Sequence, residues 1–197
     1  MNQRNYLLRI RLLDIEPEIW RRFVVPANIT LDRLHDVIQI VMGWTDSHLY
    51  AFTIGKKRYA ESPEEKEEGL ECGKYRLGDL IKQKGRSFQY TYDFGDNWEH
   101  ELAIEENQFS HPELQAEILL CLDGARACPP EDVGSVPGYY EFCKAMKDRK
   151  HPRHKELSIW YGGKYDPEYF SIDAANYMLM KYQRWTRDRL LNWEYIQ

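Results

Sequence analysis

The sequence of 197 residues lacks any apolar run near the roughly 18 residues that a membrane-spanning helix needs. We expect no signal peptide at its start, because Arg9 and Arg11 interrupt the apolar residues between Tyr6 and Leu13. Basic residues are in the minority, since 27 Lys and Arg face 32 Asp and Glu and the formal net charge is -5. We therefore expect a cytoplasmic protein with no membrane partner, and a surface that does not bind nucleic acid as a whole, although a local basic patch is compatible with this charge.

Cysteine is also scarce, and its spacing excludes a disulfide framework as the basis of the fold. The four cysteines are widely and irregularly spaced, at Cys72, Cys121, Cys128 and Cys143. In a chain of this size they are expected to be reduced thiols. Hydrophobic residues make up 43% of the chain, including 7 Phe, 6 Trp and 14 Tyr, so a core can form without a metal or a disulfide.

Hydrophobic periodicity predicts short strands and a few helices. The strands predicted from alternation are Tyr6–Leu13, Ile19–Val25, His48–Ile54 and Lys57–Tyr59. The helices predicted from an apolar face are Leu31–Met42, a segment over Tyr139–Met146, and a last helix from Ser171 with Ile172, Ala175, Met178, Leu179, Tyr182 and Trp185 on one side. Two segments, Cys121–Gly138 and His151–Gly163, are predicted to be irregular.

The clearest hairpin joins Phe88–Tyr92 to Trp98–Ile104. Its rings share one face only if Tyr92 pairs with Trp98, which also pairs Tyr90 with His100 and Phe88 with Leu102. Strands that come as hairpins between helices predict the α+β class: a single domain over 1–197, with a mostly antiparallel sheet and three to four packed helices. Within this domain we expect 61–71 to be a charged surface loop and 186–197 to be a C-terminal extension.

Acidic residues at predicted loop tips form the first candidate site. The working edge would consist of Asp93, Asp96, Asn97, Glu131, Asp132 and Asp166. Carboxylates from separate loops can hold a divalent cation, and Asp93, Asp96, Glu131 and Asp132 are the candidate ligands. The alternative is structural, because Asp and Asn at turns bond their own backbone and cap helices. His48, which follows Asp46 and Ser47, is expected only to cap or turn the chain.

Two further groups of residues have both a possible functional role and an ordinary structural one. A zinc site could use Cys121, Cys128, His151 and His154, but these residues lack the close Cys-x-x-Cys spacing of structural zinc sites. Nucleic acid could bind basic residues interleaved with aromatics, through Lys144, Lys147, Arg149, Lys150, Arg184 and Arg187. For the basic residues the alternative is the solvated face of an amphipathic helix.

Several segments together resemble the plasmid pRiA4b ORF-3-like family, which is also labelled a transposon passenger family. The matching segments are Ile19–Arg22, Val25 and Pro26, Thr30–His35, Met42–Trp44, His48 and Leu49, Tyr92–Asp96, Trp98–His100, Gly124–Gly134, Gly138 and Tyr139, Trp160, Asp166–Glu168, Phe170 and Asn176. One departure is Ser135, where the family pattern leads us to expect a second glycine. The resemblance implies one α+β domain of bacteria or archaea, often encoded near mobile DNA, with no settled activity.

The leading functional expectation is a module that binds a small ligand or a protein partner, in association with mobile elements, with loop tips as its working edge. A metal-dependent hydrolase or nuclease that uses the loop carboxylates is the first alternative. A DNA-contacting accessory protein is the second. No cofactor is evident from the sequence beyond the divalent metal that these carboxylates could hold.

Overall fold

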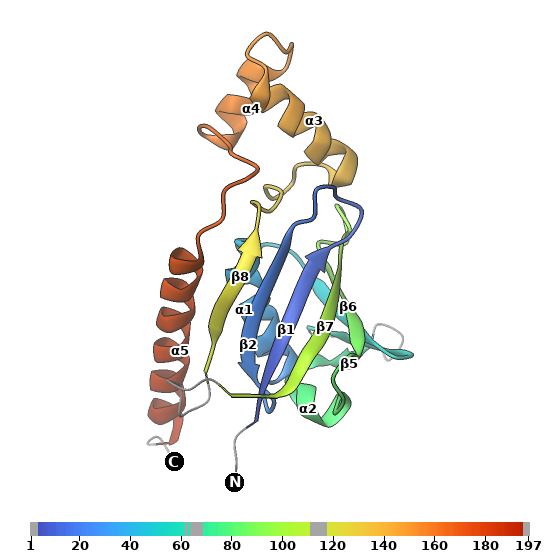
Figure 1. Cartoon of the computed structure of the whole chain (residues 1–197), viewed down its shortest axis with the longest axis vertical. Helices are drawn as coiled ribbons and strands as arrows, with labels where there is room; N and C mark the ends of the chain where they lie inside the picture. The colour runs from blue at the N-terminus through green and yellow to red at the C-terminus, as the bar shows by residue number, and fades with distance from the viewer. Residues whose placement is uncertain (1–3, 62, 64–68, 111–117, 195–197) are drawn as a thin grey trace.

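The computed structural model describes residues 4–61, 63, 69–110 and 118–194, and the side chains of these residues up to 184. One eight-stranded sheet organises the chain (Figure 1). In spatial order its strands are β5 (Leu70–Glu71), β4 (Lys57–Ala60), β3 (Tyr50–Ile54), β6 (Ser87–Tyr92), β7 (Trp98–Phe109), β1 (Asn5–Leu12), β2 (Trp20–Pro26) and β8 (Leu120–Ala125). All neighbours pair antiparallel except β4 and β5, so the α+β prediction is confirmed.

Alternation in β1 separates the two faces of the sheet. Leu8, Ile10 and Leu12 are almost fully buried in the core. Arg9 and Arg11 point to the other face, where their guanidinium groups pair with Glu18 and Glu101. Such partly exposed pairs contribute little stability, so the face that holds the fold together is the apolar one.

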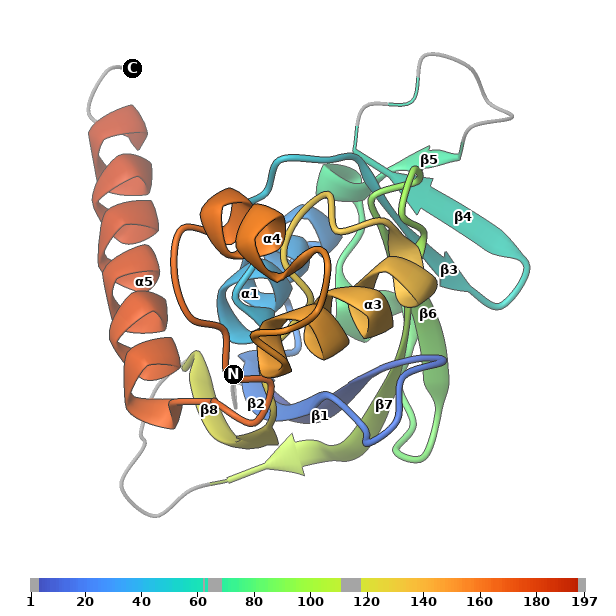
Figure 2. The same ribbon diagram turned by 90° about the horizontal axis from the view of Figure 1, so that it is seen from above.

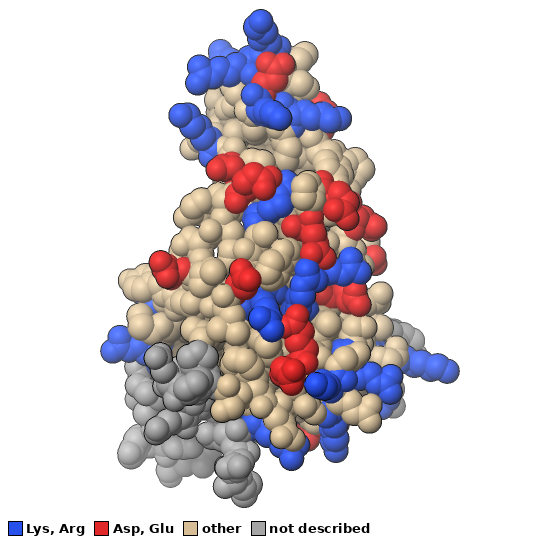
Figure 3. Space-filling model, in the orientation of Figure 1, with Lys and Arg blue, Asp and Glu red and all other residues tan. Residues whose placement is uncertain are grey.

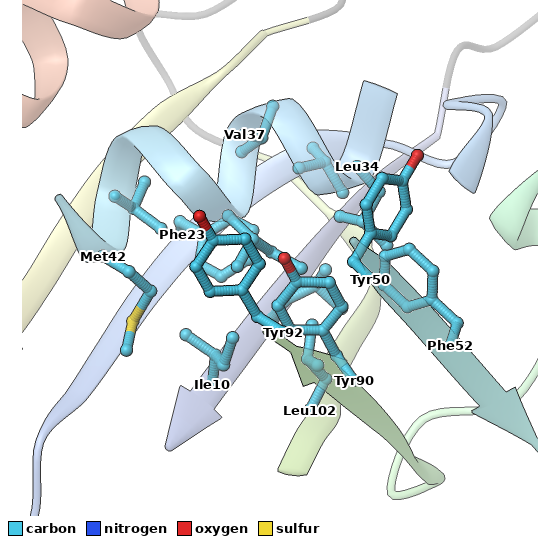
Figure 4. Close-up of a cluster of buried hydrophobic side chains, with 14 of the residues drawn as sticks. Ile10, Phe23, Leu34, Val37, Met42, Tyr50, Phe52, Tyr90, Tyr92 and Leu102 are labelled. Atoms are coloured by element: carbon cyan, nitrogen blue, oxygen red, sulfur yellow. The ribbon is translucent and has the colours of Figure 1, made fainter. Parts of the chain in front are cut away.

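The predicted hairpin register is confirmed pair by pair. Tyr92 lies opposite Trp98, Tyr90 opposite His100 and Phe88 opposite Leu102. All six side chains are buried, as a one-residue slip would not allow. Figure 4 shows Tyr90 and Tyr92 within the cluster of buried side chains that also contains Tyr50 and Phe52 from β3. The tip of this hairpin, residues 93–97, is thereby fixed in place.

Five α-helices occur in the described part of the chain. They are α1 (Leu31–Met42), α2 (Leu77–Leu80), α3 (Ser135–Lys147), α4 (His154–Tyr161) and α5 (Ile172–Glu194). A single 3₁₀ turn covers Cys72–Lys74. Helix α1 has the predicted bounds and buries its apolar face against the sheet, and it ends at Gly43 with φ of 99°. None of the helices in the described ranges is long and apolar enough to cross a membrane.

Helices α3 and α4 pack on each other as a small lobe beyond one end of the sheet, and α5 runs beside β8 (Figures 1 and 2). This α3–α4 lobe has its own small buried cluster of Phe142, Ala145 and Leu157. The loop that enters α3 therefore lies where the lobe meets the sheet. The segment predicted as a C-terminal extension falls on the continuation of α5 to Glu194, and 195–197 lie outside the described residues.

Four predictions of local structure differ from the structure. Strand β8 and helix α4 occupy segments predicted to be irregular. Neither has a periodic apolar face that would have predicted it, because β8 forms through its pairing with β2 and α4 buries only Leu157. Met178, predicted on the apolar side of α5, is half-exposed, whereas Ala175 and Leu179 are buried. The predicted loop over 61–71 ends in β5, and residues 62 and 64–68 lie outside the described part.

The contact between α1 and α5 buries a carboxyl group. Tyr182 donates a hydrogen bond of 2.6 Å to Asp36, and burial raises the pKa of Asp36 to about 6. The pKa of Asp36 is therefore higher in the folded chain than in the unfolded one. The protonated carboxyl contributes its full stability below the unfolded pKa, and this contribution is lost as pH rises through 6, because the buried group must then carry a charge. The pKa shift of Asp36 corresponds to roughly 3 kcal/mol, which solvent screening of this partly exposed group reduces to about 1 kcal/mol. We therefore expect Asp36→Asn to raise the free energy of unfolding at pH 7.5 by about 1 kcal/mol, and to leave it unchanged at pH 4.

Urea unfolding at both pH values measures this difference. Asp79→Asn, at an exposed position in α2, is the matched control and should give the same stability as the parent at both. A destabilised Asp36→Asn protein at pH 7.5 would contradict the prediction.

Candidate functional site

Three loops converge at the tip of the β6–β7 hairpin. The first is the tip itself, residues 93–97; the second is the loop from α1 to β3, residues 43–49; the third is the loop before α3, residues 128–134. Trp44 joins the second to the third, because its indole N–H donates to the Pro129 carbonyl at 3.0 Å. The Asp93 amide donates to the Leu49 carbonyl at 2.9 Å and joins the first to the second.

Glu131 is held between two of these loops by one of its carboxylate oxygens. Its Oε1 accepts hydrogen bonds from the Thr45 amide at 2.9 Å, the Thr45 hydroxyl at 3.2 Å and the Tyr92 hydroxyl at 3.0 Å. The Tyr92 hydroxyl in turn accepts from the Ser47 amide. Burial, reinforced by the nearby Glu131 carboxylate, raises the pKa of Tyr92, so the hydroxyl remains a donor at neutral pH. Glu131 Oε2 is buried and has no hydrogen-bond partner.

His48 lies at the centre of the acidic group. Its Nε2 atom is 3.2 Å from Asp132 Oδ1, 3.8 Å from Asp93 Oδ2 and 3.8 Å from Glu131 Oε2. This nitrogen is buried, yet none of the three contacts has hydrogen-bond geometry. His48 Nε2 and one oxygen each from Asp93 and Asp132 lie within 4.8 Å of one another. We call His48, Asp93, Glu131 and Asp132 the His48 cluster.

The backbone at the hairpin tip explains the position of Asp93. Its φ of 55° lies in the left-handed region, which Asp and Asn tolerate better than most residues. The side chain is 8% exposed, and its Oδ1 accepts a hydrogen bond from the Gly95 amide at 2.9 Å. This turn leaves Oδ2 directed toward His48, so the structural and the site roles predicted for Asp93 use different oxygens.

Asp96 and Asn97, also predicted at the working edge, have structural contacts. Asp96 Oδ2 accepts from the Gly134 amide at 3.0 Å, and its carbonyl accepts from the Ser135 hydroxyl. Asn97 has φ of 55° and its amide closes the turn onto the Asp93 carbonyl. Ser135, the departure from the family pattern, has φ of 65°, the region where glycine is favoured, and its hydroxyl bond to Asp96 offsets that strain.

Asp166 does not join the His48 cluster. It is exposed, and its Oδ1 accepts from the Glu168 amide within its own turn. Two groups of three His or acidic side chains close enough to share an ion occur in the described part of the chain, and Asp166 is in neither. The second of these groups, His35, Asp36 and Asp46, already has partners, because His35 bonds Tyr90 and Asp46 at 2.7 Å each.

The four residues of the candidate zinc site do not lie together in a group that could hold a metal. Burial raises the pKa of Cys121 to about 11 and that of Cys128 to about 12, which opposes the thiolate form that zinc requires. His151 contacts Glu141, and His154 donates to the Ala145 carbonyl. No cysteine in the described ranges belongs to a group that could hold a metal.

The predicted basic residues fall on two separate parts of the molecule. Lys144 and Lys147 lie in α3, and Arg149 and Lys150 in the turn that follows, all exposed. Arg184 is exposed on α5, which runs away from the α3–α4 lobe (Figure 1), and the side chain of Arg187 lies outside those described. They therefore do not form one continuous surface.

The sequence reasoning missed His48 as a member of the site. A single histidine after Asp46 and Ser47 shows no periodic or metal-ligand spacing, so nothing local separates a ligand from a turn residue. The only available signal was that His48 lies within a segment matching the family pattern. The supporting Thr45 and Tyr92 contacts arise from tertiary packing and had no signal in the sequence.

Comparison with known proteins places the chain in a family. The family model described as plasmid pRiA4b ORF-3-like protein matches residues 4–174. An uncharacterised protein, y4hQ of Sinorhizobium fredii, is 42% identical over 157 residues, which cover 79% of each chain. The crystal structure of MM3350, a protein of unknown function from Methanosarcina mazei Go1, is 34% identical, with a TM-score of 0.76 over 88% of this chain and 98% of that one. This chain belongs to the plasmid pRiA4b ORF-3-like protein family.

Proposed function

We propose that the protein is a ligand-binding module whose ligand at the His48 cluster is a divalent cation. The observation that supports this is the pair of buried atoms without hydrogen-bond partners, His48 Nε2 and Glu131 Oε2, which lie 3.8 Å apart. Buried polar atoms are nearly always satisfied, and an unpaired one calls for an explanation. A cation between the imidazole and the carboxylates would satisfy both atoms at once.

The donor set indicates which cations fit. One imidazole nitrogen with oxygens of Asp93, Glu131 and Asp132 combines the ligand that suits zinc, iron or nickel with ligands that suit manganese and magnesium. A first-row divalent ion such as Mn²⁺ or Zn²⁺ therefore fits better than Ca²⁺, which prefers six to eight oxygens. Tyr92 and Thr45 donate hydrogen bonds to Oε1 of Glu131 and so orient its carboxylate, as supporting hydrogen bonds do in metal sites.

The competing explanation is that His48 serves only as an ion-pair partner of the carboxylates. In that case the cluster would bind no metal. The two explanations make opposite predictions for titration with metal.

The test is isothermal titration of the purified, chelator-treated protein with Mn²⁺ and Zn²⁺ at pH 7. We expect one site per chain, and a His48→Ala protein that binds at least 100-fold more weakly, because loss of a ligand exceeds the 10- to 100-fold effect of losing a supporting contact. His151→Ala, which removes an imidazole paired with Glu141 in the α3–α4 lobe, is the matched control and should bind like the parent.

A thermal shift provides the second readout. Metal at 100 times the parent's Kd should stabilise the parent by about 2.7 kcal/mol and His48→Ala by no more than about 0.4 kcal/mol. Absence of heat and of thermal shift in the parent with both ions would reject the metal site and favour the ion-pair role of His48.

A metal-dependent hydrolase is the second candidate, and one observation favours it. The cluster is open on one side, since the Asp132 side chain is 72% exposed whereas that of Asp93 is 8% exposed. An ion bound there would keep a position for water, as catalytic metal sites do. Hydrolysis of bis(p-nitrophenyl) phosphate by the metal-loaded parent, lost in His48→Ala, would support this candidate. The association with mobile elements stays a prediction from the family resemblance.

A further inference from the structure

The tip of the α3–α4 lobe concentrates positive charge on an acidic protein. Residues 144–155 contain six Lys and Arg and one acidic residue, Asp148, for a net charge of +5. The whole chain carries -5, which leaves -10 for the remainder. Figure 3 shows Lys and Arg predominating over the lobe at the top of the molecule, whereas acidic and basic side chains are interspersed below it. The lobe is thus strongly basic on a chain that is acidic overall.

Most of these cations have no acidic partner. Arg153 pairs with Glu156 in the first turn of α4. Within the part of the chain that the structure describes, no ion pair involves the other five, Lys144, Lys147, Arg149, Lys150 and Lys155. All five are exposed. Like charges held together without counter-charges repel one another, so the tip is suited to a polyanionic partner.

Aromatic side chains are exposed on the same lobe. Trp160 is 47% exposed and Tyr161 40% exposed, both near the end of α4. Trp160 packs edge-on against Phe142 of α3 with ring centroids 5.8 Å apart, which anchors the indole while part of it faces solvent. Cations on the same lobe as a fixed, solvent-facing aromatic ring are a combination that suits single-stranded nucleic acid, because phosphates pair with cations and bases stack on aromatic rings.

From this combination we propose that the α3–α4 lobe binds single-stranded nucleic acid. Lys144, Lys147, Arg149, Lys150 and Lys155 contact phosphates, and Trp160 stacks with a base. An acidic polypeptide would satisfy the cations alone and would leave the exposed indole without a role. The proposal does not depend on the metal site, since phosphate contacts to Lys and Arg need no ion.

Fluorescence anisotropy with a labelled 30-nucleotide single strand, in excess EDTA, tests the proposal separately from metal binding. Each phosphate contact contributes about -0.7 to the slope of log K against log salt. Lys147→Gln combined with Lys150→Gln should therefore make the slope less negative by about 1.4 and weaken binding about 25-fold at 0.1 M salt. The matched control, Lys56→Gln combined with Lys57→Gln at the exposed β3–β4 turn, makes the same charge change and should bind like the parent.

Trp160→Leu tests the aromatic contact, and we expect about tenfold weaker binding of the single strand, within the range of one stacked base. Circular dichroism melting confirms that this protein is folded. Binding of the parent that is insensitive to salt, equal losses in the two double variants, or equal competition by polyglutamate would overturn the proposal. A duplex that binds as tightly as the single strand would overturn it as well.

Discussion

Arg21→Met should lower the free energy of unfolding by at least about 4 kcal/mol, because Arg21 is a buried cation whose five N–H donors all reach backbone carbonyls. It lies in β2 and is 1% exposed. Nε donates to Val41, Nη1 to Trp20 and Ala125, and Nη2 to Arg126, each at 2.7 Å, while Nη2 also lies 3.5 Å from the Met42 carbonyl.

The position of these carbonyls explains the size of the effect. Val41 and Met42 end α1, where the helix dipole is negative, so the guanidinium neutralises it. Ala125 and Arg126 lie where the chain leaves β8, and the Phe170 ring stacks on the guanidinium at 3.8 Å. Methionine has a similar volume but no donor, and each buried carbonyl left unpaired costs about 1–3 kcal/mol.

Urea unfolding followed by circular dichroism measures the loss, with Arg22→Met as the matched control. Arg22 is the next residue of β2, and it pairs with Glu105 on the exposed face of the sheet. An exposed pair contributes less than about 1 kcal/mol, so this control should be nearly as stable as the parent. Equal losses in the two proteins would mean that the carbonyl contacts of Arg21 contribute little.

Gly138→Ala should destabilise the protein by about 3 kcal/mol and weaken metal binding at the His48 cluster more than tenfold. Gly138 lies in the first turn of α3, where a Cβ atom would be 2.2 Å from the Val133 carbonyl oxygen and 3.0 Å from its carbon. Both are backbone atoms, so the loop that carries Glu131 and Asp132 would have to move.

The expected loss of stability in Gly138→Ala is opposite to the gain that helix propensity predicts for this substitution. Alanine is favoured over glycine in a helix by about 1 kcal/mol, so a purely local effect would stabilise α3. Gly163→Ala is the control, because a Cβ at Gly163 would meet nothing within 4 Å. Urea unfolding and Mn²⁺ titration of both proteins measure the two effects, and a stabilised Gly138→Ala protein with unchanged affinity would contradict the clash.

Periodicity was sufficient to predict those elements that bury one face. The hairpin register followed from its rings, since Tyr92 and Trp98 can be buried together only in one alignment. Helix α1 was predicted with its observed bounds for the same reason. Strand β8 and helix α4 could not be predicted in this way, because β8 depends on its pairing with β2 and α4 buries a single leucine.

The acidic residues of the candidate site were predicted in part, since Asp and Glu at turns mark loop tips but not which tips meet. Asp93, Glu131 and Asp132 converge on His48, whereas Asp96 bonds the Gly134 amide and Asp166 bonds its own turn. Local sequence could not separate the two sets, because both consist of acidic side chains in turns.

The sequence by itself determined the α+β class, the hairpin register and the family of this protein, because these depend on patterns along the chain. Only the tertiary structure decided that His48 lies among three carboxylates and that Asp96 and Asp166 do not join them. The loops that meet at His48 are far apart in sequence, and burial of the hydrophobic core, rather than any local pattern, brings them together.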